Sequence, residues 1–174
     1  MKRLSKAFFL AAVGIALGLA DILVIAGNLN KDSDPETALR LIGLSLLPML
    51  FGAVVMMVLF YKMWVAIQDG QVRTTPGKAV GLLFVPFYNI YWAFQVIWGF
   101  AKDYNAYTKR HAISVPDLLE GIFLAYTILC FTGWIPTLGL LLVVVNYFIG
   151  LLMVSKICDG VNALPVQQSF KVGV

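Results

Sequence analysis

The chain has 174 residues, of which 60% are hydrophobic and 13% charged, and its formal net charge is +4. A soluble domain is about one quarter charged, so this composition excludes an ordinary water-exposed globular fold. The basic residues lie between apolar runs and in no nucleic-acid-binding motif, which favours a lipid bilayer as partner and gives no reason to expect nucleic acid. We predict an all-α integral membrane protein with one membrane domain over residues 1–174.

Four apolar runs are candidates for transmembrane helices, because about 20 apolar residues cross the hydrocarbon core. They cover residues 7–27, 41–67, 118–135 and 137–157. The first run is longer than the core of a signal peptide, so we expect an uncleaved anchor. Capping patterns at residues 33–36 and 114–117 predict where the second and third helices begin.

Residues 79–101 form a further apolar run that is broken by Pro86 and Asn89. Proline removes a backbone donor and obstructs a helix, and the Asn89 side chain can bond the groups that are freed. The run is either a re-entrant or interfacial helical segment or a kinked ordinary span. Aromatic residues typical of the headgroup region follow the break: Tyr88, Tyr91 and Trp92.

The basic residues favour the re-entrant alternative. The first lysines and arginine place the N-terminus in the cytoplasm. If residues 79–101 enter and leave by one face, every basic residue except Lys31 and Arg40 is cytoplasmic, and so are both termini. A fifth span would place the basic cluster at residues 102–110 outside. We therefore predict four transmembrane helices plus the broken segment.

Three return segments end on similar polar residues. These are Asp69, then Asp103 with Asn105, and finally Asp159 with Asn162. Carboxylates oppose the dipole at a helix C-terminus and need compensation. One interpretation is capping by Gly70 and Gly160 together with a Lys156–Asp159 pair. The other is a ring of cytoplasmic acidic groups that docks a partner or collects cations.

The stretch PFYNIYWAFQVIWGFAKDYN and the later KICDGVNALP resemble a group of small bacterial inner-membrane proteins of uncharacterised function. The shared features are a Pro-aromatic-aromatic-Asn-x-Tyr-Trp motif and an Asp-x-Asn ending, and the likeness covers roughly residues 76–165. The resemblance implies a bacterial inner membrane and supplies no catalytic residue.

Asp21 is the most exceptional single residue, because a carboxylate inside a span costs about 2.5–3.5 kcal/mol on insertion scales. It is either a proton or cation site that faces the bundle interior or a hydrogen-bonded group near the interface, and Asn146 and Thr127 are its candidate partners. Gly14 and Gly18 form a GxxxG pair, which permits close helix packing.

The sequence contains no motif for catalysis, a cofactor or a metal, and His111 is its only histidine. We therefore expect no enzyme but a small structural, accessory or sensor subunit of an inner-membrane assembly, either a homo-oligomer or bound to other membrane subunits. The alternative is an oligomeric ion channel or small transporter whose path is lined by the broken segment. The third hypothesis is a membrane-embedded lipid-handling enzyme.

Overall fold

The computed structural model describes residues 3–132 and 139–165, and this part of the chain contains helices and no strand. The prediction of an all-α protein is confirmed. The elements in chain order are α1 (Lys6–Leu29), α2 (Pro35–Ala66), α3 (Pro76–Gly81), the 3-10 helix η1 (Leu82–Phe84), α4 (Tyr88–Ala93), the π-helix η2 (Phe94–Trp98), α5 (Gly99–Arg110), α6 (Glu120–Leu129) and α7 (Gly139–Ala163).

Three helices within the described ranges are long and apolar enough to cross a membrane: α1, α2 and the part of α7 from Leu141 to Ala163. The predicted span 118–135 differs, because its described part holds only the ten-residue α6. The predicted turn at residues 133–136, the end of that run and the first residues of the next lie outside the described residues.

The helix starts show which capping patterns operate. The side chain of Asp34 accepts a hydrogen bond from the Thr37 amide (3.1 Å), so α2 begins at Pro35, six residues before the predicted run. Thr75 caps α3 by accepting from the Lys78 amide at 3.4 Å. The pattern at residues 114–117 does not start a helix, because α6 begins only after Leu119 and no side chain caps it.

The reason for the late start of α6 is that its leading segment is held in an extended form. The carboxylate of Asp117 forms an ion pair with Lys109 (3.0 Å) instead of capping. The Asn105 side chain forms hydrogen bonds with both the amide and the carbonyl of Leu118. Tertiary contacts therefore override the local capping signal.

Small residues let α1 and α2 approach closely, which drives helix association where lipid gives no hydrophobic force. A Cβ atom on Gly52 would lie 2.8 Å from Leu17, and one on Gly27 would lie 2.7 Å from Ile42. Further small residues are buried along the two helices: Ala16, Ala20, Ala38 and Ser45.

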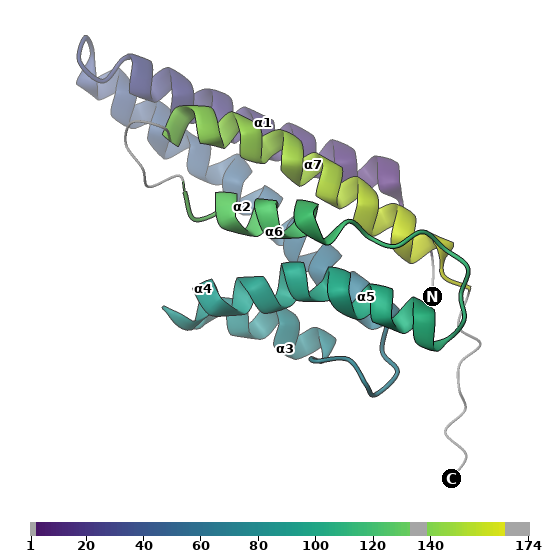
Figure 1. The fold of residues 1–174 in the computed structure, drawn as a ribbon. Helices are drawn as coiled ribbons and strands as arrows, with labels where there is room; N and C mark the ends of the chain where they lie inside the picture. Colours follow the sequence, from purple (N-terminus) through teal and green to yellow (C-terminus); the bar gives the residue numbers. More distant parts are fainter. Residues whose placement is uncertain (1–2, 133–138, 166–174) are drawn as a thin grey trace.

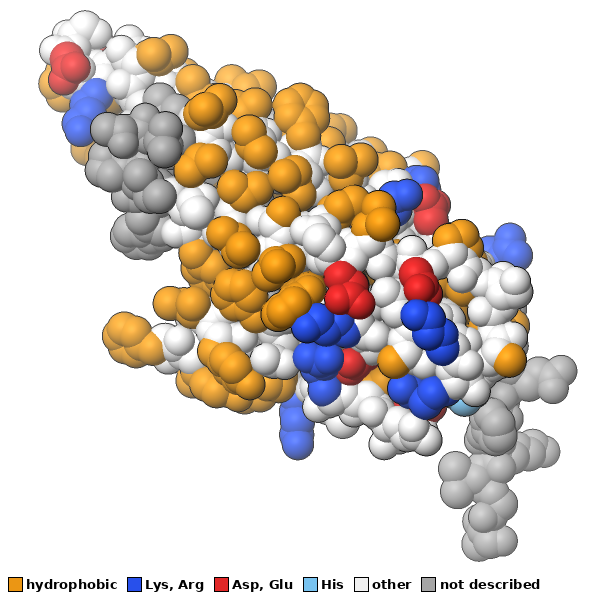
Figure 2. All heavy atoms as spheres, viewed as in Figure 1, with side chains coloured by type: hydrophobic (Ala, Val, Ile, Leu, Met, Phe, Trp, Pro, Cys, Tyr) orange, Lys and Arg blue, Asp and Glu red, His pale blue; other side chains and the backbone are white. Residues whose placement is uncertain are grey.

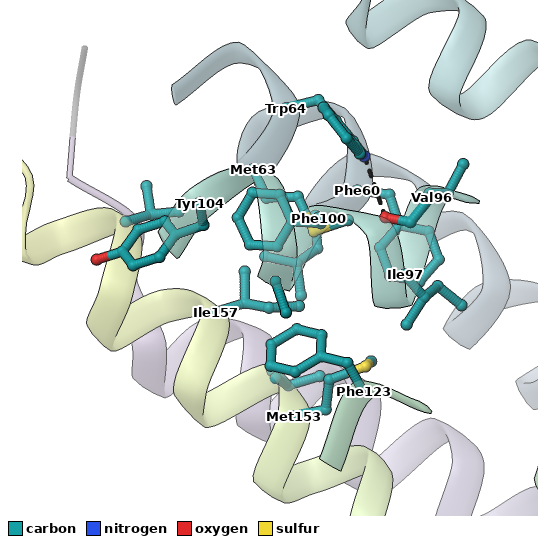
Figure 3. Packing of buried hydrophobic residues seen from close by; sticks show 14 of the residues in the cluster. Phe60, Met63, Trp64, Val96, Ile97, Phe100, Tyr104, Phe123, Met153 and Ile157 are labelled. Atoms are coloured by element: carbon teal, nitrogen blue, oxygen red, sulfur yellow. Dashed lines mark hydrogen bonds between the residues drawn. The ribbon is translucent and has the colours of Figure 1, made fainter. Parts of the chain in front are cut away.

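The molecule has two layers (Figure 1). The long helices α1, α2 and α7 run side by side, and the segment from α3 to α5 forms a second layer at an angle to them, with α6 between. The core fills the space where the layers meet (Figure 3). There the Phe100 ring packs edge-on against Trp64, with centroids 5.7 Å apart, and against Phe123 at 6.4 Å.

The surface is divided by chemistry (Figure 2). Hydrophobic side chains cover the flanks of the long helices, whereas charged side chains gather towards the ends of the molecule. One end carries the α1–α2 loop with Lys31 and Asp32. The opposite end, which we call the charged end, carries the start of α1, the ends of α2, α5 and α7, and the loops between them.

Candidate functional site

The broken segment is a helical hairpin. The chain runs through α3 and η1, reverses at residues 85–87, and returns through α4, η2 and α5 (Figure 1). The indole Nε1 of Trp92 donates to the carbonyls of Lys78 (3.2 Å) and Ala79 (3.1 Å), which ties the two arms together. Pro86 therefore stands at a reversal of the chain.

The turn is satisfied by backbone groups rather than by the Asn89 side chain. Phe87 adopts a positive φ of 62°, and the Asn89 amide donates to the Val85 carbonyl at 2.9 Å. No hydrogen bond of the Asn89 side chain occurs within the described residues. The role that we expected for that side chain is filled by the backbone, because the reversed chain brings the two groups together.

The tip of the hairpin is apolar and outward-facing. Phe87 is 91% exposed and Phe84 is 72% exposed. Tyr91 is more than half exposed, and Tyr88 stacks on Trp92 with ring centroids 5.6 Å apart. We call Phe84, Phe87, Tyr88 and Tyr91 the hairpin tip. Such exposed aromatic groups suit lipid or another protein rather than water.

The return arm contains a π-helical turn that the sequence did not predict. Its Val96 carbonyl accepts a hydrogen bond from Nε1 of the fully buried Trp64 at 3.2 Å (Figure 3). A π-turn breaks the regular α-helical ladder, so one of its carbonyls can bond outside the helix. This bond joins the hairpin to α2.

The carboxylate of Asp103 is paired with Arg73 in a forked geometry. Both Asp103 oxygens accept from the guanidinium, the shortest distance being 2.7 Å, and one also accepts from the Arg73 amide at 2.9 Å. The remaining Arg73 nitrogen donates to Gln95 at 3.0 Å. This fork fixes the loop after α2 against the hairpin.

The carboxylate of Asp69 is held by three donors. Arg110 approaches to 2.7 Å, His111 to 3.1 Å and the Gln71 amide to 2.9 Å. Burial by itself would raise the pKa of Asp69, but the hydrogen bonds and the positive charge of Arg110 together lower this pKa below its ordinary value.

The third helix end differs from the expected pairing. Asp159 forms its ion pair with Lys6 at the start of α1 (2.7 Å) instead of with Lys156. Gly160 lies inside α7 and is not its cap, whereas Gly70 has a positive φ of 81° in the loop after α2. Each acidic group of the predicted ring thus has a basic partner in the same chain.

The two asparagines bind backbone in the same way, and we call each arrangement an asparagine clasp. Asn105 accepts from the Leu118 amide (2.7 Å) and donates to the Leu118 carbonyl (3.0 Å). Asn162 accepts from the Leu4 amide (2.7 Å) and donates to the Leu4 carbonyl (2.8 Å). Each clasp holds the segment that leads into a helix, α6 or α1.

The polar residues of the apolar helices make different contacts from those that the sequence predicted. The Thr127 hydroxyl bonds the Phe123 carbonyl of its own helix at 2.7 Å, so it does not bind Asp21. Asp21 lies close enough to Tyr126 for an electrostatic interaction, and the Tyr126 ring packs against α7 at Gly150, one helical turn from Asn146. Cys130 follows Tyr126 one turn further along the chain. Sequence reasoning missed Tyr126 and Cys130, which lie four residues apart on one helix face.

Asn146 has an unusual position in this cluster. Its Oδ1 atom is buried and has no hydrogen-bond partner among the described residues. A buried acceptor without a donor is costly and is a reason to look for a proton, an ion or a polar ligand at that place.

The glycine pair packs against α7 of the same chain. The Tyr147 hydroxyl donates to the Gly14 carbonyl at 3.2 Å, and a Cβ atom on Gly18 would lie 3.2 Å from that hydroxyl. The close approach that the GxxxG pair permits is therefore used between α1 and α7.

The described ranges, 3–132 and 139–165, contain no group of three or more histidine, cysteine, aspartate or glutamate side chains that could hold a metal ion. No protein-family model, no curated protein and no solved structure matches the chain.

Proposed function

We propose that the chain is a structural, accessory or sensor subunit of a bacterial inner-membrane assembly, without catalytic activity of its own. The hairpin tip carries this proposal. Its aromatic side chains contribute to no core of the described chain, yet the hairpin that presents them is fixed by the Trp92, Trp64 and Arg73 contacts. A rigid element with an unused apolar end suits contact with a second copy or another membrane subunit.

The proposal includes a topology. The charged end carries most of the basic residues, so it is assigned to the cytoplasm together with both termini. The hairpin then enters the membrane from the cytoplasmic side and returns to it, and α6 belongs to a fourth crossing. Backbone at membrane depth must be covered by protein, which the contacts of the hairpin with α2 and α6 support.

A photo-crosslinking side chain at Phe87 tests the proposal in native membranes. The matched control is the same side chain at Ile15, which is 72% exposed on α1. We expect the Phe87 probe to give a discrete protein adduct, either with a second copy or with another membrane protein, and the Ile15 probe to give lipid adducts. A chain that is monomeric in native nanodiscs and reacts only with lipid at both positions contradicts the subunit proposal.

The unpartnered Oδ1 atom of Asn146 beside the Asp21 cluster favours one second candidate, an oligomeric ion channel or small transporter. Ion flux in liposomes tests it. Flux that is lost in Asp21→Asn, while the fold is kept, supports transport. Absence of flux from wild-type liposomes removes this candidate.

A further inference from the structure

An open apolar groove lies between α2 and the entering arm of the hairpin. It has a volume of about 430 Å³ and an almost wholly apolar lining. Leu50, Val54 and Tyr61 line it from α2, and Val80 and Phe84 line it from α3 and η1. Val54 is 63% exposed, so the groove opens outward from the flank of a helix that is able to cross the membrane.

The length of the groove matches one leaflet of a bilayer. From Leu50 to Tyr61 the helix rises by about 16 Å at about 1.5 Å per residue. Half of a hydrocarbon core of about 30 Å is about 15 Å. The groove therefore accommodates the length of one acyl chain lying along α2.

Two exposed lysines that do not line the groove themselves neighbour its lining residues in sequence, on the side of the charged end. Lys62 follows Tyr61 where α2 approaches the charged end, and Lys78 precedes Val80 where α3 leaves it. Both side chains are exposed, and neither forms an ion pair within the described residues. Four other cations of this end are bound to carboxylates, namely Lys6, Arg73, Lys109 and Arg110. Lys102 lies over the Trp98 ring, and Arg3 and Lys156 form no ion pair in the described ranges.

We infer that the groove binds an anionic phospholipid, with one acyl chain along α2 and the phosphate near Lys62 and Lys78. The apolar walls offer no partner for the backbone of a peptide, whereas the free ammonium groups complement a negatively charged headgroup. Tyr61 stands between the two regions, as tyrosine does at membrane interfaces. The groove shares Phe84 with the hairpin tip and no other residue of it, and the inference is tested without a protein partner.

The test is native mass spectrometry of the full chain released from nanodiscs that contain equal amounts of phosphatidylglycerol and phosphatidylcholine. Ala53→Phe fills the groove, and Lys62→Gln with Lys78→Gln removes its charges. The controls are Ala11→Phe, on the exposed face of α1, and Lys156→Gln, an exposed lysine of α7. Elution profile and thermal stability identify the folded variants.

We expect the wild type and both controls to retain phosphatidylglycerol in preference to phosphatidylcholine. The double lysine variant should lose this preference by about tenfold or more, since each lysine near an anionic headgroup contributes to binding. Ala53→Phe should lower the retention of both lipids. Equal retention of the two lipids by the wild type, or an unchanged preference in the folded lysine variant, overturns the inference, and so does unchanged retention by Ala53→Phe.

Discussion

A single carboxamide satisfies both backbone groups of one residue in each asparagine clasp. Leu4 and Leu118 are 5% and 6% exposed, so their backbone groups cannot rely on water. Asparagine supplies one acceptor and two donors on a short side chain, whereas aspartate lacks the donor. In both helix endings, Asp103 with Asn105 and Asp159 with Asn162, the aspartate forms an ion pair and the asparagine forms a backbone clasp.

Asn105→Ala should lower the free energy of unfolding by about 1–3 kcal/mol, because the amide and carbonyl of Leu118 lose their partners. The stability of Asn105→Asp should fall between that of the wild type and that of Asn105→Ala, since aspartate keeps the acceptor and loses the donor. The measurement is denaturant unfolding in detergent micelles. Asn28→Ala is the control, because Asn28 bonds only a helix carbonyl at an exposed position. Equal stability of the Asn105 and Asn28 variants would show that the clasp contributes nothing.

The Asp69 contacts predict a defined pH dependence. Because the pKa of Asp69 is lowered in the folded protein from its ordinary 3.8, the unfolded chain takes up the proton first as the pH falls. Asp69 therefore stabilises the fold above pH 3.8, and this contribution is lost as the pH falls through the folded pKa. Asp69→Asn should cost about 1–2 kcal/mol at pH 6.

The difference in the free energy of unfolding between the wild type and Asp69→Asn should decrease as the pH is lowered below about 4. Thermal unfolding followed by intrinsic fluorescence from pH 6 to pH 3 measures it. Asp32→Asn is the matched control, because Asp32 is exposed and has no ion pair in the described ranges. A difference that is independent of pH would contradict the assignment.

The hairpin is an element whose attachment depends on a few polar bonds and one aromatic core. The bond from Trp64 to Val96, the Arg73–Asp103 fork and the Trp92 bonds occur along its length. Phe100 and Phe123 add the apolar contact between the hairpin and α6. The irregular backbone is satisfied in two ways: the π-turn bonds a donor from α2, and the turn at residues 85–87 is closed by hydrogen bonds of its own backbone.

Trp64→Phe should loosen the hairpin, because it keeps most of the packing and leaves the Val96 carbonyl without its donor. We expect a loss of about 1–3 kcal/mol and faster amide hydrogen exchange across η2 than in the wild type. Trp98→Phe is the control, since the Trp98 ring contacts Lys102 and no hydrogen bond of its indole occurs among the described residues. Unchanged exchange in Trp64→Phe would show that the bond does not hold the hairpin.

At the scale of the whole molecule, ion pairs at the charged end join chain segments that lie far apart in sequence. The Lys6–Asp159 pair joins the start of α1 to the end of α7, and the Arg110–Asp69 pair joins the end of α5 to the loop after α2. The α1–α2 loop lies at the other end. Under the proposed topology we expect these segments to face one side of the membrane and Ser33 to face the opposite side.

Single cysteines test this arrangement in a background in which Cys130 and Cys158 are replaced by alanine. Cysteines at Gln71 and Ala106, both exposed, should react with an impermeant maleimide only from the cytoplasmic side. A cysteine at Ser33 should react only from outside. Labelling of position 106 from outside while position 71 labels from inside would show that residues 79–101 cross the membrane, and the hairpin would then be wrong.

The sequence predicts those features that depend on local patterns, such as apolar runs and prolines. The apolar runs predict α1, α2 and α7, and Pro86 marks where the chain turns. Pairing between distant residues has no local signal. The sequence therefore suggests Lys156 as the partner of Asp159, whereas the structure pairs Asp159 with Lys6, 153 positions away. The start of α6 was misplaced for the same reason, because the Asn105 clasp competes with a capping pattern that looks complete by itself.

The candidate site divides in the same way. Asp21 and Asn146 are conspicuous because polar groups in an apolar run are costly. Tyr126 and Cys130 are ordinary residues of apolar helices, and only the packing of α1, α6 and α7 brings them to this cluster. The π-turn at Phe94–Trp98 has no local signal in the sequence either, since the donor that bonds its Val96 carbonyl is Trp64 of α2.

The clasp between Asn162 and Leu4 has a consequence for biosynthesis. Residues at the beginning of α1 leave the ribosome long before α7 exists, so the Leu4 backbone and the Gly14 carbonyl have no partner until α7 has been synthesised. During that interval α2 is the main packing partner of α1 among the described elements. A ribosome that stalls before α7 therefore leaves the Leu4 backbone groups and the Gly14 carbonyl without their partners, and we expect such a chain to be less stable in the membrane than one that includes α7.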